Sequence, residues 1–233
     1  MGIKVARQKP RHFLLSLAYR LYRYFPATRA RKLDFLLDLE WIANRLAHET
    51  ATSLGLTRHT RNHFLLDGIG PADRVLDLGC GTGAVAGQVK AAHVVGIDHD
   101  ETILKIARVA NPGVEFVCAD ARDYLASAPR FDVLILSHVL EHLDEPEAFL
   151  GSFVPQFDRI YVEVPDFDAT LFNRIRADRG RQLVYNDNDH VSEFDRDEME
   201  AMFTVADLLI EDSEFIHGNM RYWLVRKTLK SSS

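Results

Sequence analysis

The stretch Arg74-Val-Leu-Asp-Leu-Gly-Cys-Gly-Thr-Gly83 decides the fold, because a short apolar run ends in three glycines that alternate with other residues. Val75, Leu76 and Leu78 predict a buried parallel strand, and the glycines predict a sharp turn into a helix over residues 83–91. Glycine adopts backbone angles that other residues avoid, and its missing side chain lets a ligand approach the main chain. We therefore expect a ligand to bind against this turn, near the positive end of the helix.

The residue before the glycines indicates the charge of that ligand. The spacing Gly79-x-Gly81-x-x-Ala84 also satisfies a dinucleotide fingerprint, so the glycines alone do not identify what binds. Asp77 lies two residues ahead of the first glycine. A carboxylate at this position would repel a pyrophosphate but would attract a cationic sulfonium or amino group.

The segment Asp77–Gly83 resembles the first motif of the class I S-adenosylmethionine (SAM) dependent methyltransferases. Three later segments, 93–98, 114–121 and 131–137, are similar to the second, third and fourth strands of that family and follow in the same order. The resemblance covers about residues 70 to 227. It implies a three-layer α-β-α Rossmann-like sheet of seven strands, mostly parallel, with an antiparallel C-terminal hairpin.

The resemblance also implies SAM as the cofactor and assigns residues to it. Asp98 would hold the ribose hydroxyls, Asp120 would meet the adenine amino group, and the amide of Ala121 would meet the adenine ring. Ser137 would lie beside the methyl donor. The cofactor-binding residues that we expect are Asp77, Gly79, Cys80, Gly81, Gly83, Asp98, His99, Asp120, Ala121 and Ser137.

The alternation of apolar runs and amphipathic segments after Asp73 agrees with this fold. We expect strands near 74–79, 93–98, 114–118, 131–137, 158–164, 208–216 and 220–227, and helices near 83–91, 100–110, 146–154 and 195–207. No helix separates the last two strands, which predicts the hairpin. We expect residues 1–70 to form a basic, helical extension that caps the domain, and residues 71–230 to form the catalytic domain.

Charge is distributed unevenly along the 233 residues, whose net charge is −6. Nine of the 28 lysines and arginines, and none of the 34 acidic residues, lie in residues 1–32, which we call the basic arm. Residues 12–25 place apolar side chains at helical spacing until Pro26, and further helices are expected near 33–51 and 58–66. The arm could contact an anionic membrane surface or a protein partner, or it could dock on the catalytic domain or a second subunit.

The two cysteines, Cys80 and Cys118, fall at predicted strand ends, so we expect reduced thiols in a cytoplasmic protein. No signal peptide or membrane-spanning run is evident. Any membrane association would then be at the inner face of the membrane, through the basic arm.

Chemistry is expected in the segment Ser137–Pro146, where His138, Glu141 and His142 are spaced i, i+3 and i+4. His190 lies in a later loop that opens on the same edge of the parallel sheet. Three interpretations remain. The four residues could hold a divalent ion (Mn, Mg or Zn) that acidifies an acceptor hydroxyl; His142 could act as a general base; or Glu141 and His142 could only hold the loop.

Pairing Glu141-His142 with the later Asp189-His190 is similar to the plant-type small-RNA end methyltransferases, which hold a divalent ion between a Glu-x-x-Glu-His segment and a distant histidine. Here His138 stands in place of the first glutamate. Some ubiquinone-pathway O-methyltransferases carry a segment like it, which widens the choice of acceptor.

The segment between residues 166 and 188 is interpreted as an insertion over the active site. Arg174 and Arg181, with Tyr185, are candidate contacts for an anionic acceptor, since guanidinium groups match phosphates and carboxylates. The alternative is a solvated helix balanced by nearby acids.

The sequence thus predicts a SAM-dependent methyltransferase that acts on an oxygen of a small molecule or saccharide, phosphorylated or lipid-linked. One alternative is a metal-dependent RNA 3'-end 2'-O-methyltransferase, although the acidic body argues against a broad nucleic-acid surface. A non-catalytic SAM-fold scaffold or regulatory partner is the other alternative, and the intact motifs argue against it.

Overall fold

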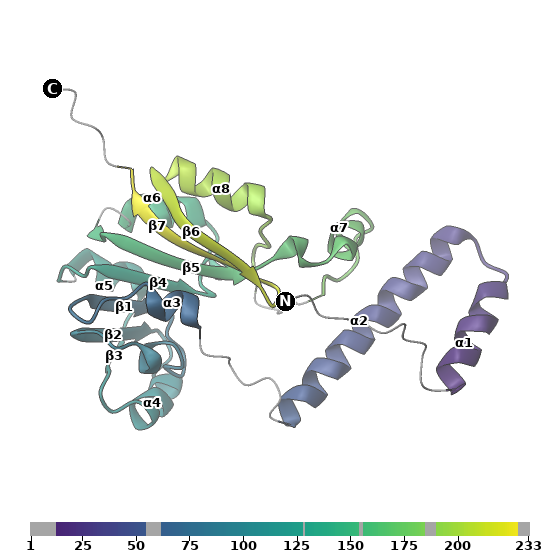
Figure 1. Ribbon diagram of the computed structural model, residues 1–233, viewed down its shortest axis with the longest axis horizontal. Coiled ribbons are helices and arrows are strands. Elements are labelled where there is room, and N and C mark those ends of the chain that lie inside the picture. Colours follow the sequence, from purple (N-terminus) through teal and green to yellow (C-terminus); the bar gives the residue numbers. More distant parts are fainter. Residues whose placement is uncertain (1–12, 55–61, 128, 154–155, 185–189, 228–233) are drawn as a thin grey trace. The chain divides into compact units, whose positions relative to one another are not determined.

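The structure is a computed structural model that describes residues 13–54, 62–127, 129–153, 156–184 and 190–227 (Figure 1). The chain divides into two compact units, residues 1–47 and residues 48–233. The second unit contains the sheet and the predicted motifs. The expected domain boundary at residue 70 stays a prediction.

A seven-stranded sheet forms the centre of the second unit, with strand order β3-β2-β1-β4-β5-β7-β6. Strands β1 to β5 pair in parallel, whereas β7 pairs antiparallel with both β5 and β6. The strands are β1 (Arg74–Leu78), β2 (His93–Asp98), β3 (Glu115–Cys118), β4 (Val133–Ser137), β5 (Arg159–Pro165), β6 (Leu208–Ile216) and β7 (Asn219–Arg226). This arrangement confirms the predicted fold, including the C-terminal hairpin.

The outermost strand of the hairpin, β6, is irregular. Its pairing with β7 shifts register between Ile210 and Asp212, so the strand carries a bulge at Glu211. Glu211 and Asp212 are exposed along it, and Glu214 is half-buried.

Helices cover both faces of the sheet. They are α3 (His63–Asp67), α4 (Glu101–Ala110), α5 (Ala121–Ser127), α6 (Pro146–Phe153) and α8 (Arg196–Val205), with 3-10 turns η1 (Ala86–Gln88), η2 (Leu140–His142) and η4 (Phe167–Ala169). Helix α7 (Leu171–Asp178) lies beyond the end of the sheet and packs on η4 (Figure 1). Helix α8 begins with a capping box between Asp195 and Glu198, as the acidic start of that segment suggests.

Successive residues of the central strands face opposite sides of the sheet, so two apolar layers form. Leu76 and Leu134 point toward the side covered by α5, α6 and α8. Val75 and Ile135 point to the other side, where Leu65 of α3 packs against them. Helix α4 covers β2 and β3 on that second side through Leu104. The sheet is thus the middle of three layers, as predicted.

The helix expected over residues 83–91 is not formed, and this prediction was wrong. The chain instead makes turns and the 3-10 turn η1, in which Gln88 and Val89 donate to carbonyls three residues earlier. The side chain of Asn111 explains the difference. Its Nδ2 donates to the carbonyl of Gly83 at 3.2 Å, and a Cβ on Gly87 would lie 1.9 Å from its Oδ1. No α-helix begins at this described turn, so the expected helix dipole does not act there.

The helices α1 (Phe13–Tyr24) and α2 (Arg29–Ser53) form a hairpin (Figure 1), and the first unit holds α1 and the part of α2 up to Ala47. The periodicity predicted both helices, and the interruption at Pro26 separates them. The rings of Tyr22 and Phe35 stack at 5.5 Å, and the Tyr22 hydroxyl donates to the carbonyl of Lys32. Residues 1–12 and 58–61, parts of the expected arm and third helix, lie outside the described residues.

In the described part of the chain, no helix combines the length and the apolar character needed to cross a bilayer.

Close packing around Gly96 of β2 gives a test of the core. A Cβ at this position would lie 2.7 Å from the Phe116 ring and 2.9 Å from Cys80 Sγ. We expect Gly96→Ala to lower the free energy of unfolding by about 1–3 kcal/mol, because a packed core resists an added methyl group. Urea unfolding followed by circular dichroism measures this. Gly113→Ala is the control, since nothing lies within 4 Å of its added Cβ. Equal midpoints for both variants would contradict the packing described here.

Candidate functional site

The turn after β1 is built from glycines in the left-handed region of backbone conformation. Gly79, Gly81 and Gly83 have φ of 70°, 52° and 75°, angles that other residues adopt only with strain. A Cβ on Gly79 would lie 3.0 Å from the side chain of Val139, whereas nothing lies within 4 Å of one on Gly81. The turn therefore touches the loop after β4 on one side and leaves space for a ligand at Gly81.

Asp98, the last residue of β2, holds this turn in place. Its Oδ2 accepts a hydrogen bond from the Gly81 amide at 2.9 Å, and its Oδ1 accepts one from the Asp100 amide at 3.0 Å. Asp100 in turn caps α4 by accepting from the amide of Thr102. His99 has Nδ1 3.5 Å from Asp98 Oδ1 and is exposed. One carboxylate thus connects the glycine turn to the start of α4.

Asp77 lies in β1, beneath the turn, with only 1% of its surface exposed. Its Oδ2 accepts a hydrogen bond from the Ala86 amide at 3.1 Å, which fixes the start of η1. Burial raises the pKa of Asp77 to about 7; the Ala86 bond lowers it, and the charge of Asp98 raises it further. Because the charge of Asp98 adds to the cost of ionising Asp77, a cation bound nearby would favour the ionised form of Asp77.

Cys80 has its backbone in the turn and its side chain in the core. The thiol packs among Leu104, Ala107 and Phe116, and burial raises its pKa to about 12. A ligand at the turn could therefore contact the main chain of Cys80 but not an ionised sulfur.

The remaining expected cofactor residues follow β3 and β4. Asp120 Oδ1 accepts from the amides of Arg122 at 2.8 Å and Asp123 at 3.2 Å, so it caps the start of α5. Ala121 is the first residue of that helix. Ser137 ends β4, beside Glu163 of β5. All of these positions lie at the carboxyl ends of parallel strands, where ligands of such sheets bind.

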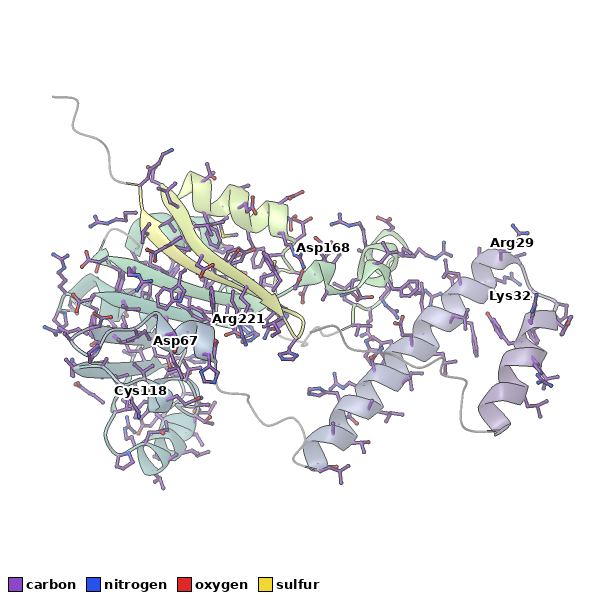
Figure 2. The ribbon with its side chains drawn as sticks, viewed as in Figure 1. Arg29, Lys32, Asp67, Cys118, Asp168 and Arg221 are labelled. Atoms are coloured by element: carbon purple, nitrogen blue, oxygen red, sulfur yellow. The ribbon has the colours of Figure 1, made fainter. Side chains whose placement is uncertain are left out.

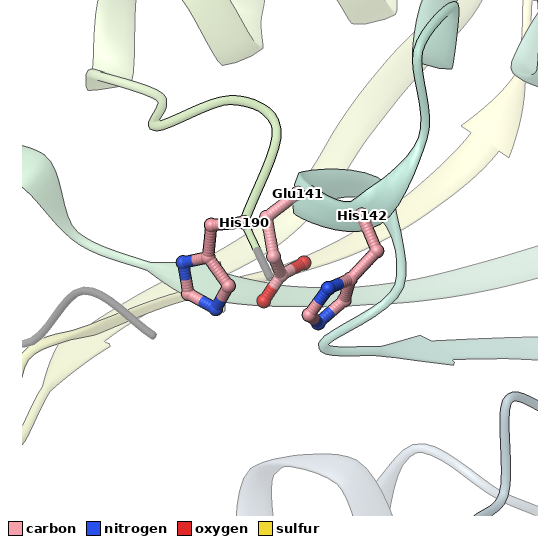
Figure 3. A group of neighbouring side chains, drawn as sticks. All are labelled: Glu141, His142 and His190. Atoms are coloured by element: carbon pink, nitrogen blue, oxygen red, sulfur yellow. The ribbon is translucent and has the colours of Figure 1, made fainter. Parts of the chain in front are cut away.

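The histidines and Glu141 form a second group at the same edge. Atoms of Glu141, His142 and His190 lie within 4.8 Å of one another, and Figure 3 shows the carboxylate between the two rings. The rings of His142 and His190 are 4.9 Å apart and nearly perpendicular. The amides of Val191 and Ser192 donate to the Glu141 carbonyl at 2.8 and 3.1 Å, which brings His190 to this place.

Glu141 is fully buried, yet one of its oxygens makes no hydrogen bond to the described residues. Oε1 is 2.9 Å from Nδ1 of His138, and Oε2 has no hydrogen-bond partner in the described part of the chain. A buried carboxylate oxygen without a partner is costly, so such an atom points to a ligand. Two imidazoles and a carboxylate are donors suited to divalent transition metals.

The structure places His138 outside this three-residue group. It has φ of 56°, and the 3-10 turn η2 begins only at Leu140, so the assumed helical spacing does not start at His138. Its amide donates to the Glu163 carbonyl at 2.8 Å, and its ring contacts Glu141. Burial lowers the pKa of His138, but the bond to Glu141 and the charges of Glu141 and Glu163 raise it above its usual value. The geometry makes His138 a neighbour that orients the Glu141 carboxylate.

The sequence analysis missed two contributors to this site. The first is Glu193, whose Oε1 lies 2.7 Å from Nδ1 of His190. The i, i+3 spacing of Glu193 and His190 in the sequence could have indicated this contact. Glu163 is a buried charge in an otherwise apolar strand, which was a signal too. Its Oε2 accepts from Tyr161 and Asn62, and its Oε1 accepts from Arg221 and Asn219.

Two of the candidate acceptor contacts lie in or just after helix α7. Arg174 is within 2.9 Å of Asp168 and 3.2 Å of Asp195, so carboxylates of the same unit already balance its charge. This pairing favours the solvated-helix alternative for Arg174. Arg181 follows α7, where its amide donates to the carbonyl of Arg176. Tyr185 lies outside the described residues.

Residues 75–154 match the family model described as a methyltransferase domain. Within residues 75–154 the chain therefore carries a methyltransferase domain. It is similar, with TM-score 0.55 and 17% identity, to magnesium protoporphyrin IX methyltransferase from Synechocystis PCC 6803 with bound S-adenosylhomocysteine; the likeness covers 92% of this chain and 95% of that one. This likeness concerns the fold alone.

Curated relatives match part of the chain. The ubiquinone biosynthesis O-methyltransferase of Thiobacillus denitrificans is 36% identical over 86 residues, which are 34% of this chain and 37% of that protein. The demethylmenaquinone methyltransferase of Renibacterium salmoninarum is 30% identical over 106 residues, 44% of each. The chain thus aligns with less than half the length of these relatives.

The buried carboxyl group of the methyltransferase domain gives a pH test. The ordinary pKa of Asp77 is 3.8, and in the folded, ligand-free protein it is about 7. Between these values the unfolded chain has lost a proton that the folded protein keeps, so the free energy of unfolding falls as pH rises, by up to about 1.4 kcal/mol per pH unit. Above pH 7 this contribution is constant.

Asp77→Asn should remove that slope while keeping an oxygen for the Ala86 amide. The measurement is urea unfolding at several pH values from 4 to 8, with the wild-type curve compared with the variant. Asp178→Asn, an exposed carboxyl group on α7, is the matched control. Parallel wild-type and Asp77→Asn curves would mean that Asp77 ionises normally in the folded protein.

Proposed function

We propose that the chain transfers a methyl group from SAM to an oxygen atom of a small molecule or saccharide. The observation that carries the proposal is the contact between the two groups of residues. The glycine turn, which we assign to the cofactor, packs through Gly79 against Val139, which lies between His138 and Glu141. A methyl donor at the turn would therefore have the carboxylate and imidazoles of the second group close to its acceptor.

The residues at the turn fit SAM. Asp98 accepts one amide on each oxygen, and each oxygen keeps a lone pair that could accept a ribose hydroxyl. Gly81 leaves open space beside this carboxylate. Asp98 gives the edge a negative charge that suits a cationic ligand, and such a ligand would also favour ionisation of the buried Asp77. When bound, SAM supplies a methyl group on a sulfonium that is already activated for transfer.

The chain's own contribution to such a reaction is mainly alignment. Holding two reactants in line can supply roughly 7–11 kcal/mol of a barrier. The turn is rigid because Asp98 bonds to it and Val139 packs on it, so a nucleophile held by the loop after β4 would keep a fixed relation to the donor. An oxygen acceptor must also lose a proton, which an imidazole at this edge could accept.

We propose in addition that Glu141, His142 and His190 hold a divalent ion, Mn, Mg or Zn. The proposal is supported by the convergence of the three side chains and by Glu141 Oε2. His138 would orient the carboxylate, and Glu193 would orient His190, as residues next to metal ligands commonly do. When bound, the ion would acidify an acceptor hydroxyl. Without an ion, His142 is the proposed general base.

The proposed class of acceptor is supported by the names of the relatives and by the positive charge of the basic arm. The name of one relative includes O-methyltransferase, which supports transfer to oxygen. An anionic or lipid-linked acceptor is proposed from the basic arm, which we also propose contacts a membrane or protein partner.

Removing the proposed ribose partner tests the cofactor assignment. We expect Asp98→Ala to weaken binding of S-adenosylhomocysteine about 10–100-fold, because hydrogen bonds to a charged group contribute that much to affinity. Calorimetric titration measures this binding. Asp123→Ala, an exposed carboxylate on α5, should bind as the wild type does. Thermal melts of both variants check folding, since Asp98 also holds Gly81. Unchanged affinity in a folded Asp98→Ala protein would refute the assignment.

Titrating Mn²⁺ into chelator-treated protein saturated with S-adenosylhomocysteine tests the metal site. The wild type should bind one ion, and His190→Ala should bind at least tenfold more weakly because a ligand is lost. His63→Ala removes an exposed imidazole on α3 and should leave the titration unchanged. If the wild type takes up no ion, the metal proposal fails, and His142 as a base becomes the working mechanism.

A further inference from the structure

The hairpin of α1 and α2 contains an apolar groove of about 780 Å³. Leu21 and Phe25 line it from the first helix and the turn, and Phe35, Leu36 and Leu39 line it from the second. These five side chains are between 45% and 65% exposed. On α2, Phe35, Leu39, Ile42 and Leu46 repeat at i, i+4, i+7 and i+11, so the apolar face continues along the helix.

Positive charge surrounds this groove. Arg31 and Lys32 belong to its lining, which contains no carboxylate. Arg29 and Lys32 lie in the first turn of α2, next to the connection between the helices (Figure 2). Arg20 and Arg23 are exposed on α1. These cations belong to the basic arm, whose nine lysines and arginines have no acidic residue among them.

The internal contacts of the hairpin fix which groups can meet a ligand. Tyr22 stacks on Phe35, donates to the Lys32 carbonyl and has the Lys32 Nζ 5.9 Å from its ring centre. Lys32 also donates to the carbonyl of Arg23 at 3.3 Å. The ring of Tyr22 is thereby engaged within the hairpin, whereas Leu21, Tyr24 and Phe25 remain exposed.

We propose that this groove and its cations bind the surface of an anionic lipid bilayer. Amphipathic helices with apolar and aromatic side chains on one side and arginine or lysine beside them bind at the boundary between headgroups and acyl chains. The apolar side chains would enter that boundary, and Arg29, Arg31 and Lys32 would meet the negative headgroups. This inference deepens the proposed membrane contact and does not depend on methyl transfer.

Charge and shape separate this occupant from two others. A second copy of the chain would bring a second set of Arg29, Arg31 and Lys32 to this groove, which like-charge repulsion opposes. A nucleic acid is held mainly by stacking rings and phosphate contacts, whereas Leu21, Leu36 and Leu39 of the groove lining offer neither. A lipid surface satisfies both the apolar lining and the positive charge.

The experiment is flotation of the full chain with vesicles of phosphatidylcholine alone or mixed with phosphatidylglycerol. We expect binding to the anionic vesicles that is at least fivefold stronger than to the neutral ones and that weakens with salt. Leu21→Glu with Phe25→Glu should reduce it at least tenfold. Arg29→Glu with Arg31→Glu should reduce it at least fivefold, since each cation near such a surface contributes a factor of about five.

Two control variants lie in the methyltransferase domain, and both should bind like the wild type. Val109→Glu changes an exposed apolar residue of α4, and Lys90→Glu reverses an exposed cation. Thermal melts and S-adenosylhomocysteine titration of every variant show that the fold is kept, and they separate a failure here from a failure of the cofactor assignment.

Three results would overturn the inference. The first is no binding of the wild type to anionic vesicles, and the second is equal binding by the groove variants and the wild type. The third is a wild-type dimer in sedimentation velocity that Leu21→Glu with Phe25→Glu converts to a monomer without any vesicle binding, since a second copy would then occupy the groove.

Discussion

The hydrogen bond from the Gly81 amide to Asp98 is the constraint on which the site depends. It joins the turn after β1 to the end of β2, and through Asp100 the same carboxylate reaches the first turn of α4. A glycine turn on its own would have many conformations, because its residues lose the most freedom on folding. The hydrogen bond to the end of β2 restricts the turn to one conformation, in which space is open beside Gly81 and Val139 packs against Gly79.

The second group depends on an equivalent connection between distant parts of the chain. The amides of Val191 and Ser192 donate hydrogen bonds to the Glu141 carbonyl, which brings together residues about fifty positions apart. In the same way, the His138 amide donates to the carbonyl of Glu163 in the neighbouring strand. Main-chain contacts therefore set the positions of these side chains at the sheet edge. Figure 3 shows the result, a carboxylate between two imidazoles.

The local pattern of apolar residues was sufficient to predict the strands that are almost completely buried. Strands β1 and β4 are apolar on both faces, and such runs have few alternatives in an α/β chain. The turn after Gly83 was predicted wrongly because the side chain of Asn111, which presses on Gly83 and Gly87, comes from the far end of α4. Helix α5 was missed because it is short and because Asp120 was considered only as a cofactor contact, although it also caps that helix.

The sequence likewise predicted part of the histidine group correctly and part of it wrongly. The shared sheet edge predicted that His190 would lie near Glu141 and His142, and the structure brings these three together. The spacing of His138 assumed a helix from that residue, whereas its left-handed backbone delays the turn to Leu140. A backbone angle of this kind follows from the main-chain bond to Glu163, which no local pattern contains.

The bulge in β6 has a consequence for how the protein behaves among copies of itself. An outermost strand offers unpaired amides and carbonyls to any other strand, which is a common start of aggregation. The shifted register between Ile210 and Asp212 twists this border, and the exposed Asp212 adds a negative charge to it, whereas Glu211 and Glu214 pair with Arg159 and Arg221. A second sheet that approached would meet a distorted ladder and like charges, so the open side of the sheet is protected against growing into a larger one.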